Sequence, residues 1–272
     1  MSTVPSGEPT PATAQAETLV RLDRVLVARG LARSRGQASE LIRSGRVVVE
    51  GRTGLKASDL VGETAVIEAD TDPYVSRGAH KLAGALDDLG LVPAGRALDA
   101  GSSTGGFTQV LLERGVEQVF AVDVGTDQLA APLRADPRVH VQEQTSARDL
   151  TTANLGDRPV DLVVADLSFI SLTKFLETFA EVTAPDGTWL LMVKPQFEVG
   201  RAALDKGGVV RSPALHRSAV EGVAAAAAAL GWHVQAVVAS RLPGPAGNQE
   251  FFVRLTRTPC VDPATPWGSA LG

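Results

Sequence analysis

A glycine-rich turn between an apolar strand and a helix is the feature that most restricts how this chain can fold. Residues 97–111 read A-L-D-A-G-S-S-T-G-G-F-T-Q-V-L. Asp99 ends the strand, Gly101 permits a tight turn, and Gly105 and Gly106 let a ligand approach the backbone of the following helix. This order is typical of an α/β domain that binds a small molecule at the turn.

Three ligand classes use such turns, and the residues discriminate between them. A phosphate loop needs a lysine where this chain has Phe107, and a dinucleotide fingerprint needs a glycine where it has Ser103. S-adenosylmethionine needs a glycine turn and, one strand later, a carboxylate for its ribose. Asp123 follows Gly101 by about 20 residues, which favours S-adenosylmethionine as the cofactor. The alternative is that these glycines are ordinary loop residues and Asp123 caps a strand.

Length and composition limit the class of protein. The 272 residues are 44% hydrophobic, enough for one large domain and a small one. The single cysteine, Cys260, excludes an internal disulfide. Residues 1–18 resemble a disordered tail and not a signal peptide, and the apolar run 223–230 is far shorter than the ~20 residues of a membrane helix. We therefore expect a cytoplasmic protein with no membrane partner.

The charge of the chain is divided unevenly. Residues 19–58 contain nine Lys and Arg against three acids, a charge of +6, so the total of -5 leaves -5 minus 6, or -11, for the remainder. A short basic module joined to an acidic body predicts a polyanionic partner that the module holds.

Within the basic module the pattern predicts two helices and a strand. Leu22, Val25 and Leu26 have helical spacing within residues 19–28. Ser34 and Gln37 form a capping box for a second helix that ends near Gly45, and a strand follows at residues 47–49.

This module resembles the S-four RNA-binding domain. R-L-D at Arg21, A-R-S-R ending at Arg35, and G-R-V-V-V-E-G from Gly45 carry the resemblance, while Glu50 departs from the neutral asparagine common in that family. The resemblance implies an RNA partner, and the resemblance of the second domain, given below, implies that this partner is ribosomal RNA or ribosomal subunits. The predicted RNA contacts are Arg21, Arg33, Arg35 and Lys56.

The remaining chain is predicted to form a second domain. Residues 19–70 make up the first domain, residues 71–75 read as a linker, residues 76–258 as the second domain and residues 259–272 as a loose C-terminal tail. The second domain opens with a helix at 77–89, in which Lys81 lies off the apolar stripe.

Apolar runs alternate with helical stretches through this second domain. Such alternation predicts a Rossmann-like, mostly parallel α/β sheet with helices on both faces, preceded here by the small α+β module. The predicted strands after Ala97 are 119–122, 162–165, 189–193, 234–238 and 251–255, with a small-residue helix at 223–230.

Three charged residues stand at predicted strand ends. Asp166 and Lys194 follow strands, and ligands of open parallel sheets bind beyond such ends. Glu250 precedes its strand, so it reaches the same edge only if that strand is antiparallel. Each charge alone could be a surface ion pair, but together they indicate a site.

The second domain resembles the catalytic domain of the TlyA-type ribosomal RNA methyltransferases, which is FtsJ/RrmJ-like. Y-V-S-R-G-A-H-K-L, D-A-G-S-S-T-G-G-F-T, A-D-L-S-F-I-S-L, V-K-P-Q-F-E and N-Q-E-F-F-V occur in the family's order, although the linker D-P-Y-V departs from the tryptophan-bearing version of some relatives. The resemblance implies S-adenosylmethionine-dependent 2'-O-methylation of a ribose in ribosomal RNA, with cytidine as the nucleoside. The implied catalytic tetrad is Lys81, Asp166, Lys194 and Glu250. The predicted cofactor-binding residues are Asp99, Gly101, Ser103, Gly105, Gly106, Phe107 and Asp123.

The tetrad suits this reaction because a ribose hydroxyl must be aimed and relieved of its proton before it attacks a methyl group. Two neighbouring ammonium groups repel, so one lysine can act in its neutral form. We expect Lys194 to be the base, Lys81 to be a positioning cation, and no metal ion to take part. Phe169 and Phe197 either stack on a flipped base or pack in the core. An RNA-binding protein without catalysis and a haemolysin are the alternatives.

Overall fold

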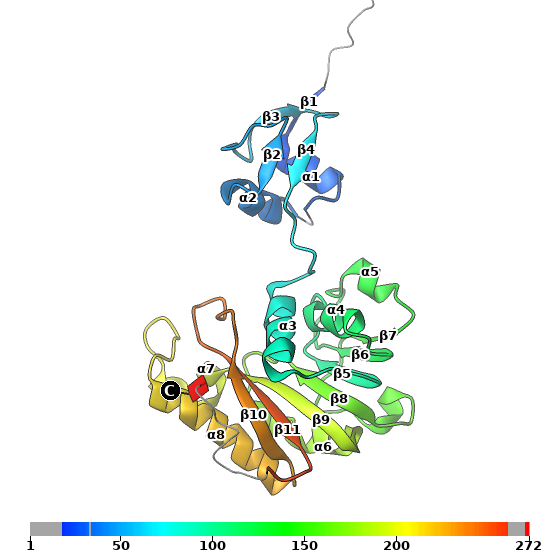
Figure 1. Ribbon diagram of the computed structural model, residues 1–272, viewed down its shortest axis with the longest axis vertical. Helices are drawn as coiled ribbons and strands as arrows, with labels where there is room; N and C mark the ends of the chain where they lie inside the picture. The colour runs from blue at the N-terminus through cyan, green and yellow to red at the C-terminus, as the bar shows by residue number, and fades with distance from the viewer. Residues whose placement is uncertain (1–17, 33, 261–269, 272) are drawn as a thin grey trace, which may run out of the picture. The chain divides into compact units, whose positions relative to one another are not determined.

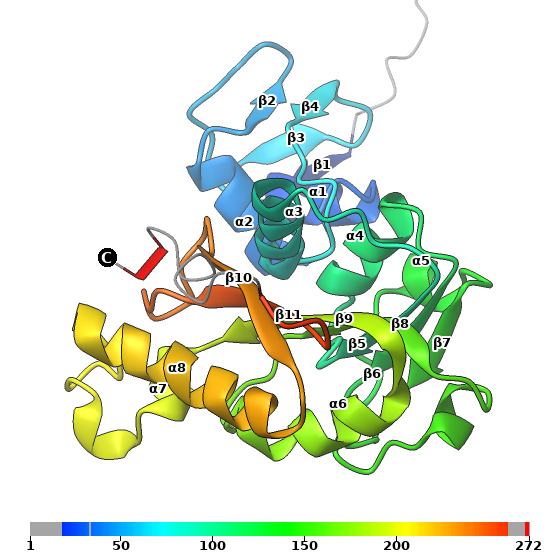
Figure 2. The same cartoon turned by 60° about the horizontal axis from the view of Figure 1, so that its bottom comes forward.

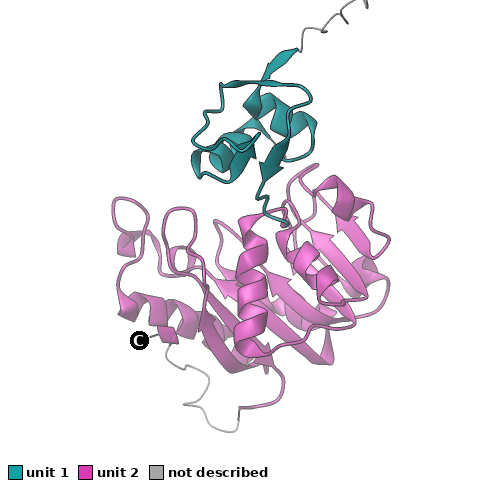
Figure 3. Cartoon of the chain, turned by 45° about the horizontal axis from the view of Figure 1, so that its top comes forward, with its two compact units in different colours: residues 1–73 teal, residues 74–272 magenta. Residues whose placement is uncertain are grey.

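The computed structural model describes residues 18–32, 34–260 and 270–271. Predictions for the N-terminal tail, for Arg33 and for most of the C-terminal tail therefore lie outside the described residues. The chain divides into two compact units, Met1–Pro73 (unit 1) and Tyr74–Gly272 (unit 2), and the division falls within the linker predicted at 71–75 (Figure 3).

The described residues of unit 1 form two short helices and two antiparallel strand pairs (Figure 1). Ser34 Oγ accepts a hydrogen bond from the Gln37 N–H, as the capping pattern predicted. The first helix begins at Leu22 and not at Leu19, because residues 19–21 pair as a strand with residues 60–62. The elements are β1 Leu19–Arg21, α1 Leu22–Ala28, α2 Arg35–Arg43, β2 Val47–Val49, β3 Leu60–Gly62 and β4 Ile67–Ala69, of which β3 and β4 were not predicted.

Unit 2 is built on a seven-stranded sheet in the order β10-β11-β9-β8-β5-β6-β7. The strands β9, β8, β5, β6 and β7 are parallel, and β11 runs antiparallel to both β9 and β10. The mostly parallel sheet predicted from the sequence is confirmed. The strands are β5 Arg96–Ala100, β6 Gln118–Val122, β7 Val139–Gln142, β8 Val160–Ala165, β9 Thr183–Val193, β10 His233–Ala239 and β11 Phe251–Thr256.

Helices cover both faces of this sheet (Figure 2). Side chains of a strand alternate between faces, so Leu162 and Val164 of β8 pack with the helices α3, α4 and α5, whereas Val163 and Ala165 pack with α6 and α8. The helices are α3 Arg77–Leu89, α4 Gly106–Glu113, α5 Ala131–Arg134, α6 Leu176–Val182, α7 Pro195–Glu198 and α8 Pro213–Ala229.

Several elements depart from the sequence prediction. Strand β7 and helix α7 were not predicted, and α8 begins at Pro213, well before the predicted Val223. Leu271 is buried in the core of unit 2, a contact that the expectation of a loose C-terminal tail did not include. In the part of the chain that the structure describes, no helix has the length and apolarity needed to cross a bilayer.

Candidate active site

The charged residues at the strand ends of unit 2 meet at one edge of the sheet. Asp123, Asp166 and Lys194 directly follow the parallel strands β6, β8 and β9. Glu250 precedes β11, and because β11 is antiparallel, the start of this strand reaches the same edge. The antiparallel arrangement that the sequence required of Glu250 is confirmed.

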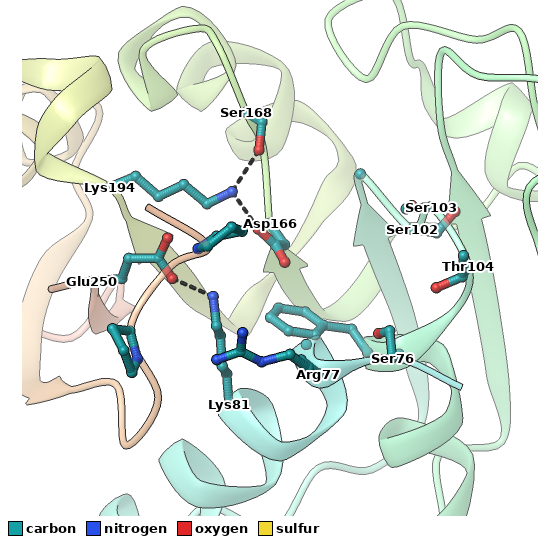
Figure 4. Close-up of a pocket in the computed structure, with 16 residues that line it drawn as sticks. Ser76, Arg77, Lys81, Ser102, Ser103, Thr104, Asp166, Ser168, Lys194 and Glu250 are labelled. Atoms are coloured by element: carbon teal, nitrogen blue, oxygen red, sulfur yellow. Dashed lines mark hydrogen bonds and ion pairs between the residues drawn. The ribbon is translucent and has the colours of Figure 1, made fainter. Parts of the chain in front are cut away.

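The four residues of the predicted tetrad line one cavity of about 450 Å³ (Figure 4). Lys81 Nζ lies 2.5 Å from Glu250 Oε2, and Lys194 Nζ lies 2.7 Å from Asp166 Oδ1. Lys81, Lys194 and Glu250 are buried, whereas a quarter of the Asp166 side chain is exposed (25%). Asp166 is therefore the tetrad member most open to a ligand.

Each lysine of the tetrad has its own carboxylate partner. The sequence-based expectation of a neutral lysine rested on the repulsion between the two ammonium groups. The two ion pairs offset this repulsion. Lys194 Nζ also donates a hydrogen bond to Ser168 Oγ at 2.7 Å (Figure 4). The side chain of Lys194 is thus fixed by two oxygen atoms from the segment that follows β8.

A second cavity of about 610 Å³ adjoins the first. Gly101, Ser103 and Asp123, three of the predicted cofactor-binding residues, line it. Gly101, Ser103, Asp166 and Ser168 line both cavities. Its volume is in the range of small-molecule sites, so a ligand bound there would border the tetrad.

The remaining predicted cofactor-binding residues lie elsewhere. Gly106 and Phe107 line the tetrad cavity. Gly105 has φ +96, and a Cβ there would lie 2.4 Å from the Leu133 side chain, so this glycine permits packing behind the turn. Asp99 is fully buried and lines neither cavity.

Gly101 is the position where the turn approaches the backbone that follows β8. Its φ is +85, and a Cβ would lie 2.8 Å from the carbonyl oxygen of Asp166. Asp123 holds the opposite side of the turn, since its two carboxylate oxygens accept the N–H groups of Gly125 at 2.7 Å and Ser103 at 2.9 Å. Carboxylate oxygens can accept further hydrogen bonds, so this role is compatible with ribose binding.

Asp99 has an unusual environment for a carboxylate. Thr108 Oγ1 donates a hydrogen bond to Asp99 Oδ2 at 2.6 Å, whereas Oδ1 has no partner among the described residues. Burial raises the pKa of Asp99 to about 7, against the weaker effect of the Thr108 hydrogen bond. The residue supports the strand end from inside the core.

Several residues of the tetrad cavity were not predicted from the sequence. Ser76, Arg77 and Ser168 line it, together with Pro243 and Pro245 of the segment before β11. Arg77 was detectable, because it precedes Lys81 by one helical turn and therefore shares its helix face. Ser168 depends on the approach of Lys194, which no sequence pattern reports.

Phe169 is not a core residue. Its side chain is 91% exposed at the rim of the second cavity, and its φ is +67, which is uncommon for a bulky residue. Its ring centroid lies 5.4 Å from that of Phe197. Of the two interpretations of Phe169, core packing is wrong.

The predicted RNA-binding residues of unit 1 fall into two groups. Arg21 and Arg35 both bind the buried carboxylate of Asp23, at 3.1 Å and 2.8 Å. Their guanidinium groups hold the pKa of Asp23 well below its usual range. Lys56 is exposed, and Arg33 lies outside the described residues. Arg21 and Arg35 therefore act as a pair whose charge Asp23 partly neutralises.

Comparison with known proteins gives the same division of the chain. Residues 74–257 match the model of the FtsJ-like methyltransferase family, and residues 20–67 match the S4 domain. The fold and the site thus define an FtsJ-like methyltransferase joined to an S-four domain. In the part of the chain that the structure describes, no group of three or more His, Cys, Asp or Glu could hold a metal ion.

Individual relatives identify the group of methyltransferases to which the chain belongs. The 16S/23S rRNA (cytidine-2'-O)-methyltransferase TlyA of Mycobacterium tuberculosis is 52% identical, over 86% of this chain and 89% of that protein. Hemolysin A of Brachyspira hyodysenteriae is 33% identical, over 87% and 99%. A solved Streptococcus thermophilus structure described as a hemolysin has a TM-score of 0.70 at 34% identity, covering 91% and 93%. The chain belongs to the TlyA-type family of rRNA methyltransferases.

Proposed function

We propose that this methyltransferase transfers the methyl group of S-adenosylmethionine to the ribose 2'-hydroxyl of a cytidine in ribosomal RNA. One observation carries the proposal: Lys81, Asp166, Lys194 and Glu250 line a single cavity that shares a wall with a second cavity of small-molecule size. Two adjoining cavities of this kind suit a reaction between a cofactor and a substrate hydroxyl.

The second cavity is the proposed cofactor site. S-adenosylmethionine, when bound, supplies an electrophilic methyl group. Gly101 gives the cofactor access to the backbone of the turn, and Asp123 offers carboxylate oxygens to the ribose hydroxyls. Phe107, Gly105 and Asp99 support this turn from the tetrad cavity and from the core.

In the tetrad cavity we assign the base role to Lys194. Asp166 Oδ1 and Ser168 Oγ, each 2.7 Å from its Nζ, aim this nitrogen at the boundary of the two cavities. In this proposal Lys194, in its neutral form, accepts the proton of the ribose 2'-hydroxyl at Nζ. Lys81, held by Glu250, supplies a fixed positive charge beside the ribose.

The RNA is held at two places in this proposal. Arg21, Arg33, Arg35 and Lys56 of unit 1 contact phosphates, as S-four domains bind RNA. In unit 2, Arg77 is exposed at the tetrad cavity and has no acidic partner among the described residues, so its guanidinium suits a phosphate of the substrate strand. The exposed ring of Phe169 suits stacking on the flipped base.

The relatives support the substrate assignment. The Mycobacterium tuberculosis relative is named for cytidine-2'-O methylation of 16S and 23S rRNA. Ribosomal RNA is a cytoplasmic substrate, and we place the enzyme there. Some relatives are described as hemolysins, but the tetrad cavity supports an enzymatic function.

Mapping of 2'-O-methyl groups on ribosomal RNA tests this proposal. Cells that lack the protein should lose the modification at one or a few cytidines, and a plasmid-borne copy should restore it. Purified protein should then methylate rRNA from the deficient cells when S-adenosylmethionine is added. An unchanged map, together with full RNA binding, would instead favour the RNA-binding protein without catalysis.

A further inference from the structure

The loop 167–172, which follows β8 and Asp166, is tied to the segment 194–198 by contacts at three points. Lys194 Nζ donates to Ser168 Oγ at 2.7 Å. The rings of Phe197 and Phe169 have centroids 5.4 Å apart. Glu198 closes the far end of the loop. The catalytic lysine and the exposed Phe169 are therefore parts of one connected assembly.

Glu198 makes the polar contacts that close this assembly. Its Oε2 accepts a hydrogen bond from Ser171 Oγ at 2.6 Å, and its Oε1 accepts the N–H of Leu172 at 2.9 Å. The side chain is half-buried, and burial raises the pKa of Glu198 against the opposing effect of these hydrogen bonds. It has no cationic partner among the described residues. A partly desolvated carboxylate held in this way is costly unless both hydrogen bonds are kept.

The backbone of the loop needs such support. Phe169 has φ +67, a conformation that costs a bulky residue on the order of 1 kcal/mol or more. Its ring is also 91% exposed, although burial would favour an aromatic side chain. Without a restraint the loop would relax toward a conformation in which the ring is covered.

We propose that Glu198 is a positioning residue that fixes the loop 167–172 so that Phe169 is presented to the substrate base. Neither the tetrad nor the predicted cofactor residues include it, and it lines neither of the two cavities. The inference rests on the proposed function, because it assumes an RNA base at Phe169. Glu198 acts only through the loop and touches no reacting atom.

A double-mutant cycle in the full chain tests this role. We expect Phe169→Ala to raise the KM for ribosomal RNA about tenfold, the loss of one base stack. Glu198→Ala should raise it by a similar factor, and the double variant should be no worse than either single variant by more than about twofold. Glu198→Gln keeps an acceptor for the Leu172 N–H and an amide that can reach Ser171, so it should stay within about threefold of the parent.

Controls separate positioning from a loss of structure. Glu181→Ala changes an exposed glutamate on α6 and should leave the KM for RNA unchanged. Ser171→Ala removes one of the two hydrogen bonds and serves if Glu198→Ala does not fold; its KM should rise by a smaller factor. If Glu198 only stabilised the fold, Glu198→Ala would weaken S-adenosylmethionine binding, measured by calorimetry, both in the parent chain and in Phe169→Ala.

Two results would overturn the inference: effects of Glu198→Ala and Phe169→Ala that multiply in the double variant, or a parent-like KM for RNA in folded Glu198→Ala. Both require an active parent enzyme. If the parent itself transfers no methyl group to RNA, the proposed function fails instead, and the two failures are distinguishable.

Discussion

Asp23 in unit 1 and Asp99 in unit 2 are both buried aspartates, at 2% and 0% exposure, but among the described residues only Asp23 has cationic partners. Asp23 binds the guanidinium groups of Arg21 and Arg35. Asp99 has one hydrogen bond, from Thr108, and one oxygen without a partner among the described residues. The arginines hold the pKa of Asp23 well below its usual range, whereas burial raises the pKa of Asp99 to about 7.

The comparison shows that the partner, and not burial alone, decides whether an inner carboxylate carries charge. Asp23 stays ionised and fixes the two arginines that we propose as RNA contacts. In the tetrad cavity, Asp166 and Glu250 resemble Asp23 in that each has a cationic partner, Lys194 and Lys81 respectively. Asp99 on β5 has no such partner among the described residues. Unit 2 therefore combines a buried carboxyl with a raised pKa beneath its turn, Asp99, with two lysine-paired carboxylates in the tetrad cavity.

The largest effect is expected at Lys194, the proposed base, which pairs with Asp166. Lys194→Ala should lower the single-turnover rate by about a thousandfold, the contribution of a general base, while binding of S-adenosylmethionine and rRNA persists. Lys194→Arg should fail as well, because a guanidinium keeps the charge but cannot accept the proton. Near-parent rates in the arginine variant would leave Lys194 with an electrostatic role only.

A pH effect should separate the two buried aspartates. Between about pH 4 and pH 7 the folded chain binds a proton at Asp99 that the unfolded chain has released, so the stability of unit 2 should fall as pH rises, by on the order of 3 kcal/mol. Asp23 has the opposite sign: its contribution is present above about pH 4 and is lost at lower pH.

Tryptophan fluorescence can follow this effect, because all three tryptophans of the chain belong to unit 2. Urea unfolding between pH 5 and pH 8 should show the decline in the parent and a flatter profile in Asp99→Asn. The exposed Asp149→Asn is the matched control and should behave like the parent. A persistent decline in Asp99→Asn would assign the pH effect to another group.

A change at the turn should affect the cofactor more than the fold. Gly101→Val should reduce S-adenosylmethionine affinity by roughly thirtyfold or more, since a side chain 2.8 Å from the Asp166 carbonyl costs about 2 kcal/mol of rearrangement. Calorimetric titration measures the loss. Gly115→Val is the control, because Gly115 has φ +92 but open space around it. Equal losses in both variants would point to backbone strain, and binding of NAD in place of S-adenosylmethionine would refute the assignment of the turn.

The smallest effect is expected in unit 1. Alanine at Arg21, Arg33, Arg35 and Lys56 should lower rRNA affinity about tenfold and flatten its salt dependence, because fewer counterions are released. The variant should also carry Asp23→Asn, since removal of both arginines leaves a buried charge without a partner. Filter binding at several salt concentrations measures both quantities. Arg217→Ala, which breaks a surface pair with Glu221, should change neither, and unchanged affinity in the multiple variant would contradict the RNA role.

Local patterns in the sequence were enough to predict much of the fold. The N-cap at Ser34, the helix at 77–89 and the strand-turn-helix at Gly101 were all predicted, because caps, periodicity and glycine turns act over a few residues. The short strands β3 and β4 were missed, since their pairing partners lie distant in the chain. The start of α8 was missed because the prediction rested on the alanine-rich run after Gly222 and not on the residues before it.

The sequence by itself determined which residues could form the site: a lysine on a helix, an aspartate and a lysine after parallel strands, and a glutamate before an antiparallel one. Tertiary structure decided which lysine pairs with which carboxylate, that Ser168 joins Lys194, and that Phe169 is exposed while Asp99 is not. The physical reason is that strand-end position follows from local pattern, whereas ion pairing and desolvation depend on atoms that approach from elements far apart in the chain.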